Sequence, residues 1–366
     1  MSLCVRSSLR CGTSAIRSCE GAGDAVVRSQ IMKQDASARL IYEAIQQLGW
    51  DADPTHLADR IRGLESGLPA EDEFACLLAW FGKCQLVHSL DQSQHPAESR
   101  NTIQVPDLLA VLEPCDHGDA QTVLIEVKTS KKPRLSWTPA YMTKVKKYAA
   151  FVGLPLLVAW KFQSLWTLVS VDAFTQPERN LHLSLQDALR HNLMGILAGD
   201  FAYAMRPKVG LHLYITKERL ISEHQQSDSE REEHWQYRIR DAYFLNEAGQ
   251  RKSQLRTGLW PLFISACPEA KDEVTESSIH QQFCIPDEPD IHFAHAALPI
   301  LIAFSAKEEA PLLWRKQLDG GEFPVKFEVF RKAATEGIED GFVQVVLDQK
   351  PVEIPEFIGK NDRTKP

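Results

Sequence analysis

Three charged residues interrupt apolar segments of this sequence: Asp107, Glu126 and Lys128. Asp107 lies near the start of Val105–Leu112, and the other two lie within Thr122–Thr129. Both segments otherwise have the composition of buried strands. Carboxylates and amines are costly to bury unless they are paired or bind a metal ion. Two such interruptions on neighbouring strands therefore predict a functional site.

The expected geometry brings these side chains together. Glu126 and Lys128 share one face of their strand because side chains alternate across a strand. Residues 113–121 are rich in turn formers and predict a hairpin, which would place Asp107 beside Glu126. Oxygen ligands of this kind suit Mg²⁺, which takes one or two carboxylates plus waters and substrate phosphate. Lys128, about 7 Å along the same face, would orient or help deprotonate an attacking water, or offset charge on the phosphate.

The pattern Pro106-Asp107…Glu126-Val127-Lys128 resembles the PD-(D/E)xK nuclease superfamily, which includes many restriction enzymes and Holliday-junction resolvases. The resemblance covers roughly residues 68–175. It implies a restriction-endonuclease-like α/β core, with a mixed sheet flanked by helices. It also implies Mg²⁺, for which Mn²⁺ can substitute, held by Asp107 and Glu126. The implied reaction is phosphodiester hydrolysis to a 5′-phosphate and a 3′-hydroxyl.

In this superfamily a helix with a further acidic residue precedes the two strands. Ala70–Gly82 fits that helix, with an apolar stripe at helical spacing formed by Phe74, Leu77, Leu78 and Phe81. Glu73 is the predicted third carboxylate, catalytic and metal-binding, and Glu71 is the alternative. Both lie in the first turn, where a carboxylate can also simply complement the helix dipole.

A helix and another strand follow the Glu-x-Lys strand in the superfamily. Pro139–Gly153 predicts the helix, with the glycine as its stop, and Pro155–Phe162 predicts the strand. In resolvase-like members this helix carries a polar residue, often Gln, four positions before a Tyr. The corresponding residues here are Lys144 and Tyr148, so Lys replaces Gln.

The charge distribution favours an anionic partner locally but not globally. The chain has 41 Lys and Arg against 49 Asp and Glu, a net charge of −8, which argues against a general nucleic-acid coat protein. Val127–Val171, however, contains no acidic residue. A basic patch beside a metal site suits a phosphodiester backbone; a solvated helix face is the alternative interpretation. The predicted nucleic-acid contacts are Lys131, Lys132, Arg134, Lys144, Lys147 and Tyr148.

A length of 366 residues predicts two or three domains. Residues 1–31, rich in Arg, Ser and Gly, predict a disordered leader or a start codon placed too early. Residues 32–67 predict an N-terminal helical segment, and 68–175 the nuclease core. Residues 176–366 carry no recognised motif; we assign them to specificity or partner binding.

Residues 176–366 predict an additional α/β or β-rich part. The apolar pattern predicts a helix at Leu183–Leu197 and strands at Val209–Ile215, Ala296–Ala306, Val325–Phe330 and Gly341–Leu347. The charged composition of His224–Glu233 predicts a loop or mobile insertion. Ala296–Ala306 is too short to span a bilayer, so no membrane role is expected. Eight cysteines without CxxC spacing favour a reducing compartment, and we expect a cytoplasmic protein.

These observations predict a divalent-metal-dependent endonuclease acting on DNA, in a defence, mobile-element or repair system. The alternative is a non-catalytic module on a nuclease fold that binds nucleic acid or a protein partner. A third interpretation is an unrelated protein, in which Asp107 and Glu126 would lie more than about 8 Å apart. A homodimer and a protein partner bound through residues 176–366 are further expectations. The sequence does not separate DNA from RNA, nor does it define substrate structure or sequence specificity.

Overall fold

The computed structural model describes residues 3–7, 69–113, 119–176, 179–227, 230–252, 258–267, 270–305 and 314–359. The chain divides into two compact units. The core unit comprises Lys33–Phe201, Leu313–Glu322 and Asp348–Pro366; the β-rich unit comprises Met1–Met32, Ala202–Leu312 and Phe323–Leu347. The leader predicted at 1–31 and the helical segment predicted at 32–67 lie outside the described residues, apart from strand β1 (Leu3–Ser7).

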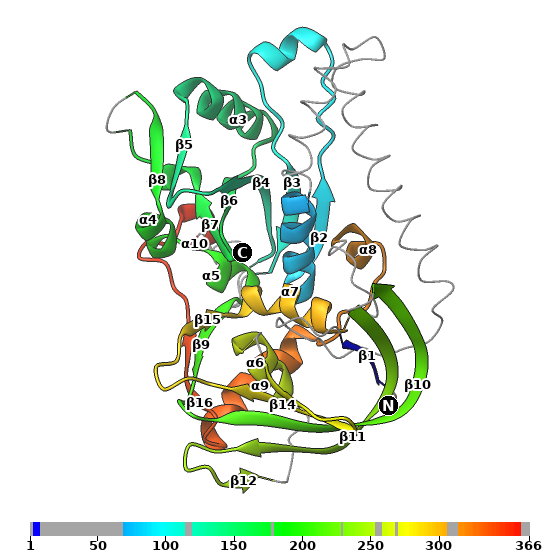
Figure 1. The fold of residues 1–366 in the computed structure, drawn as a ribbon. Coiled ribbons are helices and arrows are strands. Elements are labelled where there is room, and N and C mark those ends of the chain that lie inside the picture. Colours follow the sequence, from blue (N-terminus) through cyan, green and yellow to red (C-terminus); the bar gives the residue numbers. More distant parts are fainter. Residues whose placement is uncertain are drawn as a thin grey trace. The chain divides into compact units, whose positions relative to one another are not determined.

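The core unit is built around a mixed five-stranded sheet (Figure 1). In spatial order its strands are β2 (Cys84–Ser89), β3 (Leu108–Leu112), β4 (Gln121–Ser130), β6 (Leu156–Phe162) and β7 (Leu165–Ser170). Strands β4 and β6 run parallel, and the other neighbouring pairs run antiparallel. The expected fold class, a mixed sheet flanked by helices, is confirmed.

Helices cover both faces of this sheet, which explains why β4 is buried at five successive positions, Val123–Val127. Helix α3 (Pro139–Val152) packs against one face through an apolar cluster that includes residues of β4, β6 and β7. The helix formed by residues 69–81 packs against the other face, where the Phe74 ring lies 4.9 Å from that of Trp166.

Both helices end where the sequence predicts. Helix α3 begins after Thr138, whose side chain accepts a hydrogen bond from the backbone N–H of Tyr141. It ends at Gly153, whose φ of 69° is a left-handed conformation that glycine adopts without strain. The helix at 69–81 ends before Gly82 in the same way, with φ at 74°. As a crossover connection, α3 allows β6 to return parallel to β4.

Shorter elements complete the described part of the core unit: η1 (Ala97–Asn101), β5 (Arg134–Trp137), η2 (Val171–Ala173), β8 (Leu181–Ser184), α4 (Leu185–Arg190), α5 (Met194–Ala198), α8 (Trp314–Leu318) and α10 (Glu356–Gly359). The prediction of one helix at Leu183–Leu197 is wrong, because that segment contains the end of β8 and two short helices. Buried Asn192 separates the helices, since its Oδ1 accepts hydrogen bonds from the backbone N–H groups of Leu168 and Met194.

The β-rich unit contains two sheets and three helices among its described residues. The larger sheet has the order β1-β11-β10-β14-β13, with β12 on β11, and the smaller has the order β15-β9-β16. The elements are β9 (Phe201–Met205), β10 (Gly210–Ser227), β11 (Glu230–Leu245), β12 (Arg251–Lys252), α6 (Trp260–Ala266), β13 (Lys271–Val274), β14 (Ser278–Cys284), β15 (Ile291–Phe293), α7 (Ala294–Ser305), α9 (Phe327–Glu339) and β16 (Val343–Asp348). The expected β-rich part is thus confirmed. In neither unit does a described helix combine the length and apolar character needed to cross a membrane.

Three predictions in the β-rich unit are wrong. His224–Glu233 belongs largely to the β10–β11 hairpin, which pairs as far as Ser227 and Glu230, because a charged composition does not prevent backbone pairing. Ala296–Ala306 lies mostly in helix α7, and Val325–Phe330 leads into helix α9. Apolar runs this short do not distinguish a strand from a helix. The strands predicted at Val209–Ile215 and Gly341–Leu347 are confirmed as parts of β10 and β16.

Candidate active site

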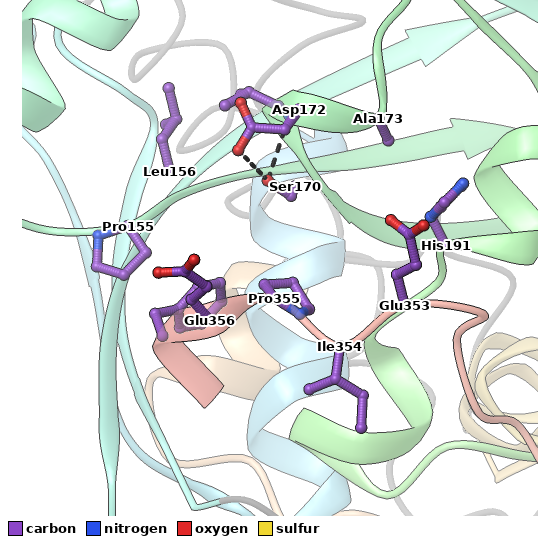
Figure 2. A pocket seen from close by; sticks show the side chains of 12 residues that line it. Pro155, Leu156, Ser170, Asp172, Ala173, His191, Glu353, Ile354, Pro355 and Glu356 are labelled. Carbon is purple, nitrogen blue, oxygen red and sulfur yellow. Dashed lines mark hydrogen bonds between the residues drawn. The ribbon is translucent and has the colours of Figure 1, made fainter. Parts of the chain in front are cut away.

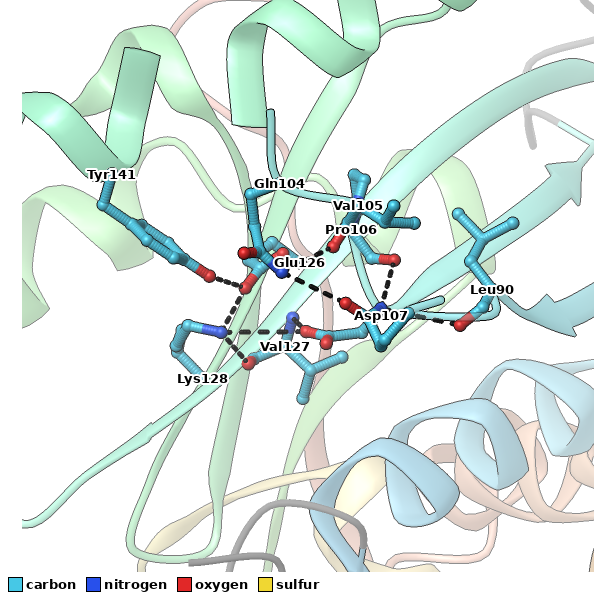
Figure 3. Close-up of polar contacts among 10 residues, drawn as sticks. Leu90, Gln104, Val105, Pro106, Asp107, Glu126, Val127, Lys128 and Tyr141 are labelled. Carbon is cyan, nitrogen blue, oxygen red and sulfur yellow. Dashed lines mark hydrogen bonds and ion pairs between the residues drawn. The ribbon is translucent and has the colours of Figure 1, made fainter. Parts of the chain in front are cut away.

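Asp107 and Glu126 face each other across the β3–β4 hairpin (Figure 3). Leu108 pairs with Ile125 in the antiparallel register, so the same register one residue earlier sets Asp107 opposite Glu126. Asp107 Oδ2 accepts a hydrogen bond of 2.7 Å from the backbone N–H of Val127. The hairpin expected from the sequence therefore brings the two carboxylates together.

Lys128 joins the two carboxylates. Its Nζ donates to Glu126 Oε1 and to the backbone carbonyl of Val127, the latter at 3.0 Å, and lies 3.7 Å from Asp107 Oδ2. Strand alternation places Glu126 and Lys128 on the same face of β4, as the sequence predicted. We define Asp107, Glu126 and Lys128 as the charged cluster.

The charged cluster is partly buried and sets two carboxyl groups against one amine. The side chain of Glu126 is 1% exposed, and burial, followed by repulsion from Asp107, raises its pKa to about 7. Burial also raises the pKa of Asp107, although Lys128 opposes the shift. Burial acts to lower the pKa of Lys128, but Glu126 and Asp107 outweigh it and raise that pKa, so the amine stays charged at neutral pH. A bound cation would favour the ionised form of both carboxyl groups.

The structure does not bring Glu73 into the charged cluster. Its carboxylate pairs with Lys161 Nζ and accepts a 2.9 Å hydrogen bond from Trp166 Nε1. The β4–β6 register pairs Glu126 with Val158, so alternation turns Lys161 toward the opposite face of the sheet. Glu73 thus anchors its helix on the far side of the sheet from the charged cluster, and its assignment as the third carboxylate is corrected.

Glu71 is the helix carboxylate that interacts with the charged cluster. Burial, followed by repulsion from Asp107, raises the pKa of Glu71 to about 8, and Glu126 contributes in the same direction while Lys128 opposes it. The neighbouring buried residue, Asp72, pairs with Arg315 of α8 at 3.5 Å. Contacts made by Asp72 and Glu73 therefore fix the first turn of the helix on which Glu71 lies.

The charged cluster has features that suit a divalent cation. Glu126 Oε2 is buried and accepts no hydrogen bond from any described residue. Leaving a buried carboxylate oxygen unpaired is costly unless a cation or water satisfies it. Within the described ranges, no three side chains among His, Cys, Asp and Glu converge closely enough to hold an ion by themselves. Mg²⁺ commonly needs only one or two carboxylates, with waters filling the other positions.

Tyr141 is a member of the site that the sequence did not single out. Its hydroxyl donates a hydrogen bond to Glu126 Oε1, and Lys128 Nζ lies 5.6 Å from its ring centroid. In the sequence it is only one of several aromatic residues among the lysines. Its place in the first turn of the helix after the Glu-x-Lys strand is the signal that could have identified it.

The predicted nucleic-acid contacts divide into two groups. Lys131, Lys132 and Arg134 are exposed where β4 ends and β5 begins, just beyond Lys128. The others make contacts within the core unit. Lys144 Nζ donates to the Arg100 carbonyl at 3.1 Å, and Lys147 Nζ lies 5.8 Å from the Phe151 ring centroid. Tyr148 is partly buried and packs against the apolar cluster between α3 and the sheet.

A cavity of about 760 Å³ in the core unit is distinct from the charged cluster. Figure 2 shows it between the start of β6, the end of β7 and the segment leading into α10. Its lining includes the carboxylates Asp172, Glu353 and Glu356 but no residue of the charged cluster. Carboxylates on its wall make it poorly suited to a phosphate backbone.

No protein-family model and no curated protein matches the sequence. The structure is similar to that of a Holliday junction resolvase from the archaeal hyperthermophile Archaeoglobus fulgidus, with 19% sequence identity and a TM-score of 0.26. The similarity covers 33% of this chain and 86% of the resolvase chain.

Proposed function

We propose that this chain is a divalent-metal-dependent endonuclease that hydrolyses phosphodiester bonds in DNA. The observation that carries the proposal is the convergence of two carboxyl groups, Asp107 and Glu126, and one amine, Lys128, on one end of the β3–β4 hairpin. Glu71 adds a further carboxylate nearby. The exposed side chains of Lys131, Lys132 and Arg134 lie immediately beyond the end of β4, where they would hold a backbone phosphate.

Asp107 and Glu126 would hold Mg²⁺ or Mn²⁺, with Glu71 as the carboxylate that completes the negative site. The bound cation would polarise the scissile phosphate and lower the pKa of a water. Hydrolysis forms a bond from the water oxygen to phosphorus and breaks the bond to the 3′ oxygen, which takes up a proton. The products are a 5′-phosphate and a 3′-hydroxyl.

Lys128 suits charge stabilisation better than proton abstraction. Its amine is held by two carboxylates, which keep it protonated. A protonated amine cannot accept a proton from water, but it can offset the negative charge that develops on the phosphate. Lys131, Lys132 and Arg134 would position the backbone through exposed charges at the end of β4.

Cleavage of supercoiled plasmid by the purified full chain tests the proposal, with Mg²⁺, Mn²⁺ or EDTA present. We expect nicking or linearisation that needs metal and is lost in Lys128→Ala. Lys83→Ala, which changes an exposed lysine of the same unit, is the matched control and should cut normally. Metal-dependent DNA binding without cleavage would identify a binding module instead. Cleavage that persists in EDTA, or in Lys128→Ala, would overturn the proposed site.

A further inference from the structure

The two oxygens of the Glu126 carboxylate have different environments. Oε1 accepts hydrogen bonds from both Lys128 Nζ and the Tyr141 hydroxyl (Figure 3). Oε2 is buried and accepts none from the described residues. Lys128 and Tyr141 therefore hold the side chain by Oε1 and leave Oε2 without a bond from either of them.

The position of the Tyr141 hydroxyl is fixed independently of Glu126. The backbone N–H of Tyr141 donates to Thr138 Oγ1 at 3.2 Å, at the N-terminus of α3. Its ring meets the buried Trp137 ring edge-on, with centroids 5.1 Å apart and an interplanar angle of 83°. The Trp137 ring in turn lies 5.0 Å from that of Phe174. The N-terminus of α3 and the packed rings of Trp137 and Phe174 thus hold the Tyr141 side chain in place.

We infer that Tyr141 is a positioning residue for the proposed cation: with Lys128 it holds Glu126 Oε1, so that Oε2 is the oxygen presented to the ion. The inference rests on the proposed function, and it adds a residue that acts through Glu126 rather than on the substrate. Hydrogen bonds to a metal-binding side chain orient that side chain, and their loss commonly costs about 10- to 100-fold in metal affinity or activity.

A purely structural role makes a different prediction. If the hydroxyl only satisfied a buried hydrogen bond, Tyr141→Phe would lower the melting temperature and leave metal affinity unchanged. A positioning role predicts that metal affinity falls even when the fold is retained. It also predicts that the effect requires the Glu126 carboxylate, so that Tyr141→Phe adds little to Glu126→Gln.

The test is Mn²⁺ binding to the full chain, by calorimetry and by electron paramagnetic resonance, with and without a DNA duplex. We compare the wild type, Tyr141→Phe, Glu126→Gln and the double variant, with melting temperatures in EDTA to confirm folding. Thr143→Ala removes an exposed hydroxyl from the same helix, one that donates to the Pro139 carbonyl at 2.8 Å, and is the control for affinity. We expect Tyr141→Phe to weaken Mn²⁺ binding about 10-fold or more, with no further loss in the Glu126→Gln background.

Two other outcomes are distinct. The inference is overturned if folded Tyr141→Phe binds Mn²⁺ within twofold of the wild-type affinity. It is also overturned if Tyr141→Phe weakens Mn²⁺ binding equally in the Glu126→Gln background. Either result leaves the proposed nuclease intact. Absence of Mn²⁺ binding by the wild type, with and without DNA, overturns both.

Discussion

The carboxylate of Asp107 accepts a 2.7 Å hydrogen bond from the backbone N–H of Val127, the residue between Glu126 and Lys128. This bond ties the residue that precedes β3 to the middle of β4. An asparagine at position 107 would remove the negative charge but keep this hydrogen bond, because its Oδ1 also accepts from a backbone N–H.

Asp107→Asn should therefore fold normally and lose activity. Loss of the negative charge removes a proposed metal ligand, and we expect plasmid cleavage to fall about 100- to 1,000-fold while the melting temperature in EDTA stays close to that of the wild type. Asp172→Asn, at an aspartate whose side chain is 80% exposed, is the control and should cut normally. Wild-type cleavage by Asp107→Asn would show that the site is misassigned.

Glu71 and Glu73 should respond in opposite ways to the same substitution. Glu71→Gln should reduce cleavage on the order of 100-fold without loss of stability, because glutamine resembles the neutral acid that burial favours at this position. Glu73→Gln leaves Lys161 without its ion pair and should cost about 1–3 kcal/mol of unfolding free energy, with cleavage per folded molecule retained. Urea unfolding and single-turnover cleavage measure the two effects, and the reverse pattern would restore Glu73 as the helix ligand.

The stability of the metal-free protein should fall as pH rises through the neutral range. Glu71 and Glu126 titrate near 4.5 in the unfolded chain but at about 8 and about 7 in the folded one. Between these values the folded state binds more protons, so the stabilisation is fully present below about pH 4.5 and is lost as pH rises through the folded pKa values.

Urea unfolding in EDTA from pH 5 to pH 8.5 measures this dependence. The double variant Glu71→Gln/Glu126→Gln removes both groups and should flatten the profile. Added Mg²⁺ should raise the melting temperature more at pH 8 than at pH 6, because the cation competes with protons for the same oxygens. A wild-type profile in EDTA as flat as that of the double variant would contradict the burial of these carboxyls.

Replacing Lys131, Lys132 and Arg134 together by Ala should weaken DNA binding in a salt-dependent way. Each phosphate contact releases counterions, so the slope of log affinity against log salt should become shallower by about 3. Lys146→Ala is the control, since Lys146 lies in the same basic stretch but pairs with Asp172 at 3.0 Å. Fluorescence anisotropy over a salt series measures the slope; an unchanged slope would place the backbone-binding surface elsewhere.

The charged cluster could be predicted because it depends on local geometry. Strand alternation and a hairpin register are enough to place Asp107, Glu126 and Lys128 together. The choice between Glu71 and Glu73 could not be made this way, because it depends on how the helix that carries both is rotated against the sheet. Helix α7 was mistaken for a strand for a related reason, since an apolar run shows no period once all of its sides are apolar.

The core unit is discontinuous in sequence, and this determines when it can fold completely during synthesis. Arg315 reaches Asp72, Asn192 Nδ2 donates to Gln349 Oε1 at 2.9 Å, and the backbone N–H of Val352 donates to the Arg190 carbonyl at 2.9 Å. A ribosome makes Arg315, Gln349 and Val352 long after the sheet that they support. During translation the helix formed by residues 69–81 therefore cannot make its Asp72–Arg315 ion pair until most of the β-rich unit has been synthesised. A chain stalled before that point cannot complete the core unit.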